Sequence, residues 1–232
     1  MLPWVRMPTA WIQNQSTPGL KEFGPQDNGS SIAALLIYVA ITMEVNDRDA
    51  ELAVANDTAL LTYADFSKVT GLSRAMISRG IQRLVDTGLI EKATNGRNNV
   101  FKLVGNSATW GKLPKSYLIN NCLLDKLTHR SRNELDALKM YLLFIAFRHN
   151  QWNFALISYP KIAQYTGVQE FRIRSGLSLL VNLSLIQIDR SREIQGKKGN
   201  PPSQYRICGI DPRRHMGTQK AESMLDDGMH ET

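Results

Sequence analysis

Arginine and serine side chains are concentrated in one short segment, SRAMISRGIQRL, at residues 73–84. The guanidinium group is a planar fork of N–H donors that suits guanine edges and phosphate oxygens, and serine hydroxyls bond bases or backbone. Ile77, Ile81 and Leu84 recur at helical spacing, so the segment should be a helix with these residues facing the core. We therefore expect nucleic-acid contacts from Ser73, Arg74, Ser78, Arg79, Gln82 and Arg83. The alternative is a solvated basic face on a helix that only packs.

A predicted β-hairpin follows this helix and carries further cations. The segment DTGLIEK should end the helix and begin a strand, and VFKL should be the returning strand. Between them, Asn95 and Gly96 form a dipeptide that is typical of two-residue hairpin turns. Lys92, Arg97 and Asn98 on this hairpin are expected to hold phosphates.

The chain contains this unit twice. Residues 61–90 align without a gap, at an offset of 96, with residues 157–186, and identities include the pairs Thr70/Thr166, Gly71/Gly167 and Gly80/Gly176. Each copy is preceded by a similar lead-in, WVRMPTAWI at residues 4–12 and WGKLPKSYL at residues 110–118. A repeat of about a hundred residues predicts two domains, 1–105 and 106–210, followed by a flexible tail at 211–232.

The order of predicted elements is the same in both copies. Apolar residues recur at three and four from Ile32 to Met43 and from Leu135 to Ala146, which indicates an amphipathic helix. A short helix should end at Gly71 or Gly167, where glycine allows the left-handed turn, and Ser73 should cap the third helix. The fold class is therefore mainly α with small β-hairpin wings (α+β), organised as two tandem winged helix-turn-helix domains.

Residues 61–90, with TGLSRAMISRGIQRLVDTGLI, resemble the winged helix-turn-helix of bacterial DNA-binding proteins. The tandem arrangement, with the lead-ins RMPTAWI and KLPKSYL, looks most like plasmid and phage replication-initiator proteins. This resemblance implies that the third helix enters the major groove and that the wing follows the backbone. Two modules on one chain would suit a directly repeated site about one helical turn apart. Transcription regulators share the same module, so a repressor stays an alternative.

The second copy differs on its third helix. Arg74, Ala75, Arg79 and Arg83 are replaced by Glu170, Phe171, Ser175 and Leu179, while Arg172 and Arg174 are gained. Its longer hairpin carries the cations Arg190, Arg192, Lys197 and Lys198. We expect the first copy to read sequence and the second to supply backbone affinity, a homodimer or other protein contact through Leu179, or both. The alternatives are that the second copy reads another sequence, or that the helical wheel is rotated.

The lead-ins have two interpretations. Trp4, Pro8 and Trp11 could form a stacking platform for single strands. Because the pattern recurs at the same distance before the first helix of each copy, we expect it to pack as a lid over the core.

Composition supports a nucleic-acid binder over an enzyme. The net charge is +7, and residues 211–232 hold five acids against three bases, so the positive excess lies in the two copies. Two cysteines at unrelated positions fit a reducing cytosol, and DNA binding would place the protein on the nucleoid, so the expected location is cytoplasmic and nucleoid-associated. The apolar runs IAALLIYVAITM and MYLLFIAF are too short to span a bilayer, so no membrane partner is expected. The chain shows no phosphate-cradling loop, nucleophile elbow or metal-ligand spacing, so we expect no cofactor and no catalysis. The winged helix-turn-helix resemblance and the positive charge make double-stranded DNA the expected partner. A protein-interaction adaptor is the remaining class.

Overall fold

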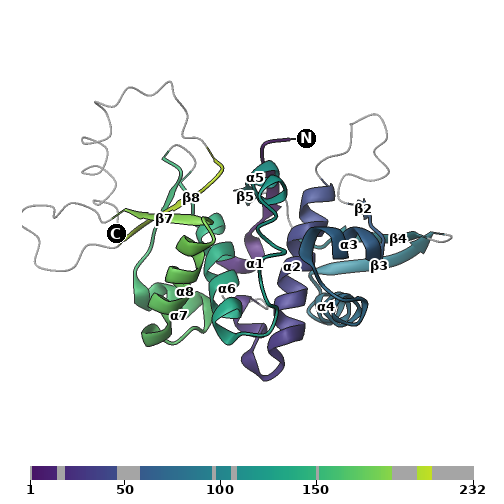
Figure 1. Cartoon of the computed structure of the whole chain (residues 1–232), viewed down its shortest axis with the longest axis horizontal. Coiled ribbons are helices and arrows are strands. Elements are labelled where there is room, and N and C mark those ends of the chain that lie inside the picture. The colour runs from purple at the N-terminus through teal and green to yellow at the C-terminus, as the bar shows by residue number, and fades with distance from the viewer. Residues whose placement is uncertain are drawn as a thin grey trace, which may run out of the picture.

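The computed structural model describes residues 2–14, 19–45, 58–95, 98–105, 109–149, 152–189 and 203–210. Within these residues the fold is a mixture of helices and small antiparallel sheets. Two long helices lie in the middle, and each carries a group of shorter helices and a sheet on its outer side (Figure 1). The predicted α+β class is therefore confirmed at the level of secondary structure. The tail beyond residue 210, expected to be flexible, lies outside the described residues.

The α-helices and β-strands of the described residues follow the same order in the two halves of the chain, and the first half adds two 3₁₀ helices, η1 and η2. The first half contains β1 (Val5–Pro8), α1 (Ala10–Gln13), η1 (Leu20–Glu22), η2 (Pro25–Asp27), α2 (Asn28–Val45), β2 (Thr58–Leu60), α3 (Tyr63–Thr70), α4 (Arg74–Asp86), β3 (Ile90–Asn95) and β4 (Asn98–Leu103). The second contains β5 (Trp110–Leu113), α5 (Lys115–Asn120), α6 (Arg132–Ala146), β6 (Phe154–Leu156), α7 (Tyr159–Thr166), α8 (Glu170–Asn182), β7 (Ile186–Asp189) and β8 (Gln204–Ile207). The three-stranded sheets have matching orders, β2-β4-β3 and β6-β8-β7.

Local sequence signals position the short helices. Thr62 and Asp65 form a capping box at the start of α3, and the hydroxyl of Ser73 accepts a hydrogen bond from the Met76 N–H at the start of α4. Gly71 and Gly167 end α3 and α7 with φ values of 69° and 71°, in the left-handed region where glycine has no steric cost. These turns set the angle between the second and third helices of each half.

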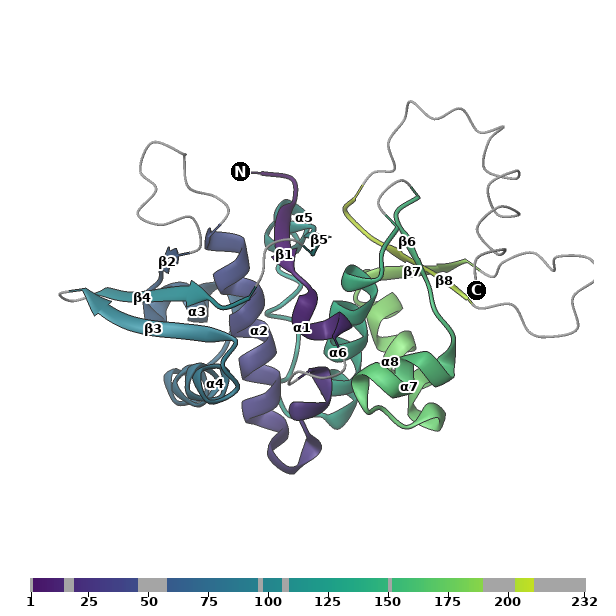
Figure 2. The ribbon, with the colours of Figure 1, turned by 180° about the vertical axis from the view of Figure 1, so that it is seen from behind.

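The two lead-ins pair with each other. Strands β1 and β5 form an antiparallel ribbon in which Val5 faces Leu113, Arg6 faces Lys112 and Met7 faces Gly111. Arg6 and Lys112 are equivalent positions of the repeat, so their pair lies on a local two-fold axis, and the pairs on either side exchange with one another. The repeated lead-in is therefore explained by symmetry, because each copy supplies one strand of a shared ribbon, seen from behind in Figure 2.

Aromatic rings and cations alternate across this ribbon. Trp4 and Trp110 stack with parallel rings at a centroid distance of 6.0 Å. The Arg6 guanidinium lies 4.8 Å from the centre of the Trp110 ring, and the Lys112 ammonium lies 4.4 Å from the centre of the Trp4 ring. Because the rings are occupied by one another and by the two cations, this arrangement supports a packing role for the lead-in tryptophans.

The rest of the lead-in packs on the core, as expected. The Trp11 indole N–H donates to the Tyr38 hydroxyl, which donates to the Pro8 carbonyl. Beyond the ribbon, the Gln13 amide donates to the Ala146 carbonyl of α6, and the Lys115 ammonium donates to the Met43 carbonyl of α2. Each lead-in thus satisfies a carbonyl near the end of the other half's long helix, so the two halves share one continuous core. The boundary predicted at 105/106 stays a prediction.

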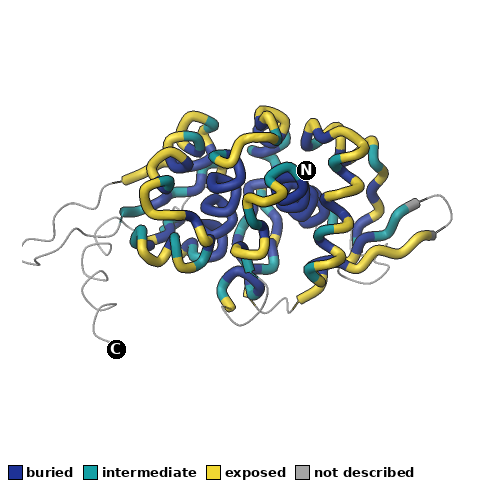
Figure 3. The backbone as a smooth tube through the Cα atoms, turned by 90° about the horizontal axis from the view of Figure 1, so that it is seen from below, coloured by how far each residue is buried: buried dark blue, intermediate teal, exposed yellow. Residues whose placement is uncertain are grey.

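Helix α2 is the most apolar element of the fold. By length and composition alone the segment Pro25–Val45 could cross a membrane, and the expectation that its apolar run is too short was wrong because the helix continues past that run. Within the fold 78% of an 18-residue window of this segment is buried, as in the core helix of a globular domain. Figure 3 shows α2 and the other buried segments in the centre, with the exposed ones around them.

Candidate nucleic-acid interface

Helix α4 presents an exposed ridge of hydroxyl, amide and guanidinium groups. Ser73, Arg74, Ser78, Arg79 and Gln82 are all exposed, as the helical spacing predicts. Ile77, Ile81 and Leu84 are buried on the opposite side, against α2. Within the described part of the chain, neither Arg74 nor Arg79 forms an ion pair with a carboxylate. Their guanidinium groups are therefore available to an external anion or a base edge.

Arg83 lies elsewhere, which corrects the expectation that it belongs to this ridge. It is half-buried, its guanidinium donates to the Glu22 carbonyl at 2.8 Å, and it lies 5.7 Å from the centre of the Phe23 ring. The physical reason is that η1 packs beside α4 and covers Arg83. A helical wheel of α4 alone cannot predict a neighbour from another part of the chain. Gln82 is exposed, but its amide donates to the Asp86 carboxylate at 2.8 Å, so part of its hydrogen-bonding capacity is used within the helix.

A shallow, open depression of about 630 Å³ adjoins the ridge. It is lined by Thr62, Tyr63, Ala64, Ser67, Arg74 and Asn99. The Arg74 guanidinium lies 5.9 Å from the centre of the Tyr63 ring, so the start of α3 and the start of α4 meet here. Thr62, Tyr63 and Asn99 were not predicted as site residues, although the Thr62–Asp65 capping-box spacing was a signal for the start of α3.

Of the three hairpin residues predicted to hold phosphates, only Lys92 has a described side chain. Lys92 is exposed on β3 and is paired in register with Phe101 of β4. Its phosphate contact stays a prediction. The backbone of Asn98 pairs with Asn95 at the hairpin end. The side chain of Asn98 and the whole of Arg97 lie outside the described residues.

The third helix of the second half, α8, has a different surface. Glu170, Phe171, Arg174, Ser175 and Ser178 are exposed, and Phe171 is 78% exposed, the highest value among the exposed large hydrophobic residues. Arg174 is accessible, as predicted. The four predicted hairpin cations of this half, Arg190, Arg192, Lys197 and Lys198, lie outside the described residues.

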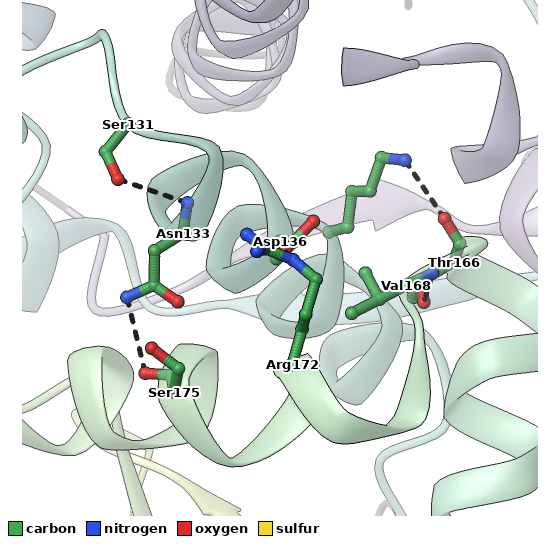
Figure 4. A network of polar contacts seen from close by, with 8 residues as sticks. Ser131, Asn133, Asp136, Thr166, Val168, Arg172 and Ser175 are labelled. Carbon is green, nitrogen blue, oxygen red and sulfur yellow. Dashed lines mark hydrogen bonds and ion pairs between the residues drawn. The ribbon is translucent and has the colours of Figure 1, made fainter.

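Arg172 was also predicted to contact DNA, and the structure places it in an internal ion pair. Its Nε donates to the Asp136 carboxylate at 2.7 Å, and the two side chains are 25% and 6% exposed. Figure 4 shows this pair between α6 and α8, beside the bond from the Asn133 amide to the Ser175 carbonyl. Asp136 stands where the first half has Ala33. Because it lies on α6, the pattern of α8 alone does not reveal the partner of Arg172.

Leu179 is half-buried and packs against the core. It occupies the same place as Arg83, on the side of the third helix that meets the rest of the protein. The rotated wheel therefore accounts for its position, and a homodimer or other protein contact through the second half stays a prediction.

A buried lysine distinguishes the second half from the first. The Lys139 ammonium donates to the Thr166 carbonyl at 3.0 Å, where the first half has Leu36 at the equivalent position. Burial lowers the pKa of Lys139 to about 8, with Asp136 acting in the opposite direction and the charges of Arg132 and Arg83 adding to the lowering.

This pKa shift predicts a pH-dependent stability. Between pH 8 and the ordinary lysine value of 10.5, the unfolded chain holds a proton that folded Lys139 has released. The free energy of unfolding should therefore rise with pH in that window, by about 1 to 2 kcal/mol between pH 7.5 and 9.5 relative to Lys139→Leu. Urea titrations of both proteins at the two pH values measure this difference. The tyrosines with raised pKa values, Tyr38, Tyr141 and Tyr205, oppose the rise at higher pH but are common to both proteins. Equal pH dependence in both would contradict the assignment.

Across the described ranges, no group of three or more histidine, cysteine, aspartate or glutamate side chains could hold a metal ion. Comparison of the chain with protein-family models, curated proteins and solved structures gave no match.

Proposed function

We propose that the protein is a non-catalytic, sequence-specific double-stranded DNA-binding protein of the replication-initiator type, acting in the cytoplasm on the nucleoid or a plasmid. In this proposal each half is a winged helix-turn-helix module, with α4 and α8 as recognition helices and the hairpins β3–β4 and β7–β8 as wings. The observation that carries it is the exposed ridge of α4, with Arg74 and Arg79 outside any ion pair of the described residues, in a helix-turn-helix-hairpin unit that occurs twice.

The local two-fold axis alters the expected DNA site. The register of β1 and β5 relates the two lead-in strands by rotation, not by translation along one direction. The side chains of Gln13 and Lys115 bond to equivalent carbonyls of the two long helices, Ala146 and Met43, which is consistent with the same rotation for the helices. When both modules bind one duplex, their two-fold axis lies perpendicular to the axis of the DNA. The two recognition helices then meet half-sites of opposite orientation. The proposal therefore replaces the directly repeated site with two inverted half-sites of unequal sequence.

The same symmetry favours a second candidate function. Operators of transcription repressors mirror the two-fold symmetry of the proteins that bind them. A single chain whose two halves are related by a two-fold axis could bind such an operator in the same way as it would bind a replication origin. Transcription regulation is therefore retained as the alternative, with the same mode of DNA binding.

The two modules have unequal roles in this proposal. The first module reads bases through Arg74 and Arg79, because arginine pairs with two acceptors of guanine at once. The second module has Arg174 on its exposed face, while Arg172 is held by Asp136. Its contribution to affinity should therefore come from the hairpin cations and from the groups around Phe171.

The experiment that tests the proposed function is selection of bound duplexes from a random pool, followed by sequencing. We expect a site with two conserved blocks about one helical turn apart and in opposite orientation, with guanines in one of them. Recovery of duplexes without a shared sequence would contradict sequence-specific binding. A direct repeat of one sequence in the selected site would contradict the two-fold arrangement.

The cations of the second hairpin give a prediction that separates affinity from specificity. Changing Arg190, Arg192, Lys197 and Lys198 to alanine should weaken binding to all duplexes alike, because phosphates carry no sequence information. The slope of log affinity against log salt should become shallower by about 3 to 4, since each phosphate that is no longer neutralised reduces it by about 0.9. Fluorescence anisotropy titrations from low to moderate salt measure this slope.

Arg206 supplies a matched control at the base of the same hairpin. Its guanidinium is already bonded to the Asp189 carboxylate at 3.1 Å. Arg206→Ala should therefore leave the salt slope nearly unchanged. A loss confined to one sequence in the fourfold variant would mean that this hairpin reads bases.

A further inference from the structure

Among the described residues, the most exposed large hydrophobic side chain lies on the second recognition helix. Phe171 is 78% exposed and is the second residue of α8, at the position that Ala75 occupies in α4. An exposed phenylalanine side chain does not stabilise the fold, because its apolar surface stays in water. In the proposed complex this first turn of the helix meets the edges of the bases.

The groups around Phe171 favour a base edge over a phosphate as its neighbour. Glu170 precedes it on the same exposed turn, and its carboxylate repels phosphates but accepts hydrogen bonds from the amino group of cytosine. The nearest arginine in sequence, Arg172, is directed away into its ion pair with Asp136. Arg174 lies one turn further along the helix and is exposed. The start of α8 is thus an apolar and acidic tip followed by one cation.

We propose that Phe171 determines the specificity of the second module by packing on the C5-methyl groups of thymine in the major groove. Thymine is the one base that presents an apolar group there, and phenylalanine is among the residues that contact it. Ala75 is also apolar but much shorter, so the two modules would favour different sequences at the corresponding step. This inference rests on the proposed function and assigns a base preference to a residue that phosphate binding does not explain.

Deoxyuridine substitution tests the proposal, because it removes only the methyl group of thymine. In the selected duplex, each thymine of the half-site that belongs to the second module is replaced singly by deoxyuridine. Wild-type protein should lose about fourfold in affinity at one or two positions, the value expected for one buried methyl group. Phe171→Ala should bind the thymine and deoxyuridine duplexes equally, and Phe171→Leu should keep part of the difference.

The controls separate this proposal from the proposed function itself. Deoxyuridine in the half-site of the first module should affect wild type and Phe171→Ala alike. Selection repeated with Phe171→Ala should lose thymine at the affected positions and keep the block read by α4. Thermal melting should be unchanged, since the residue is exposed. If wild type binds no specific duplex, the proposed function fails.

Three results would overturn the inference while leaving the proposed function intact. The first is a wild-type protein that binds the thymine and deoxyuridine duplexes equally at every position of that half-site. The second is an equal methyl effect in wild type and Phe171→Ala. The third is Phe171→Ala with unchanged DNA binding but a lower mass by light scattering, which would assign Phe171 to a contact between proteins.

Discussion

Replacing Arg74 and Arg79 together by alanine should lower the affinity for the selected duplex by about 100-fold or more. Each arginine that pairs with a guanine contributes roughly 1 to 3 kcal/mol of discrimination, and both lie on the exposed ridge of α4. Binding to unrelated duplexes should fall much less, because the remaining cations still contact phosphates. Anisotropy titrations with the selected duplex and with a scrambled one measure both effects.

The matched control is a double lysine variant, which keeps both positive charges but lacks the planar guanidinium group. Lysine at both positions preserves two positive charges but cannot form the planar fork that pairs with two acceptors at once. Arg74→Lys with Arg79→Lys should therefore bind scrambled duplexes like wild type and lose most of the preference for the selected one. All these proteins should melt within a few degrees of wild type, since exposed polar substitutions usually change stability by less than about 0.5 kcal/mol. Unchanged affinity of the alanine variant would refute the ridge as the site of base contact.

Alanine at Gly80 should destabilise the protein, whereas alanine at the equivalent Gly176 should not. A Cβ atom at Gly80 would lie 2.8 Å from the Ala33 backbone carbon and 2.9 Å from the Ala34 backbone nitrogen, so α4 would have to move away from α2. Such overpacking typically costs about 1 to 3 kcal/mol, against a gain of about 1 kcal/mol in helix propensity. The net effect expected from urea unfolding is a loss of up to about 2 kcal/mol.

The Gly176 position differs because its nearest neighbour is movable. The closest atom to an added Cβ is the end of the Met140 side chain, and the nearest backbone atom, the Ala137 nitrogen, is at 3.4 Å. Met140 can change rotamer, so Gly176→Ala should be neutral or stabilising by up to about 1 kcal/mol. Equal destabilisation at both positions would contradict the packing described for the two helix pairs.

Much of the fold follows from local sequence patterns. The buried stripe of Ile77, Ile81 and Leu84, the left-handed turns at Gly71 and Gly167 and the hairpin after α4 were predicted and are confirmed. These features depend on periodicity and on the special backbone freedom of glycine, which a single sequence records directly. The sequence repeat also predicted that the two halves are structurally equivalent, and the aligned residues form the same helices and strands in the same order.

The errors arose where a residue meets a distant part of the chain. Arg83 binds the carbonyl of Glu22, and Arg172 binds Asp136, so two predicted DNA contacts are engaged within the protein. The repeated lead-in was seen in the sequence, but its pairing with itself depends on the register of two strands about a hundred residues apart. Long-range pairing of that kind leaves no periodic signal in either segment.

The salt dependence of duplex binding tests the central claim most directly. A protein that presents the α4 ridge and two basic hairpins to one duplex should neutralise about six phosphates. Log affinity for the selected site should then fall against log salt with a slope near −5, and the preference over scrambled DNA should survive at moderate salt. Absence of duplex binding at low salt, or binding with a slope near zero, would contradict the account and favour an adaptor that contacts other proteins.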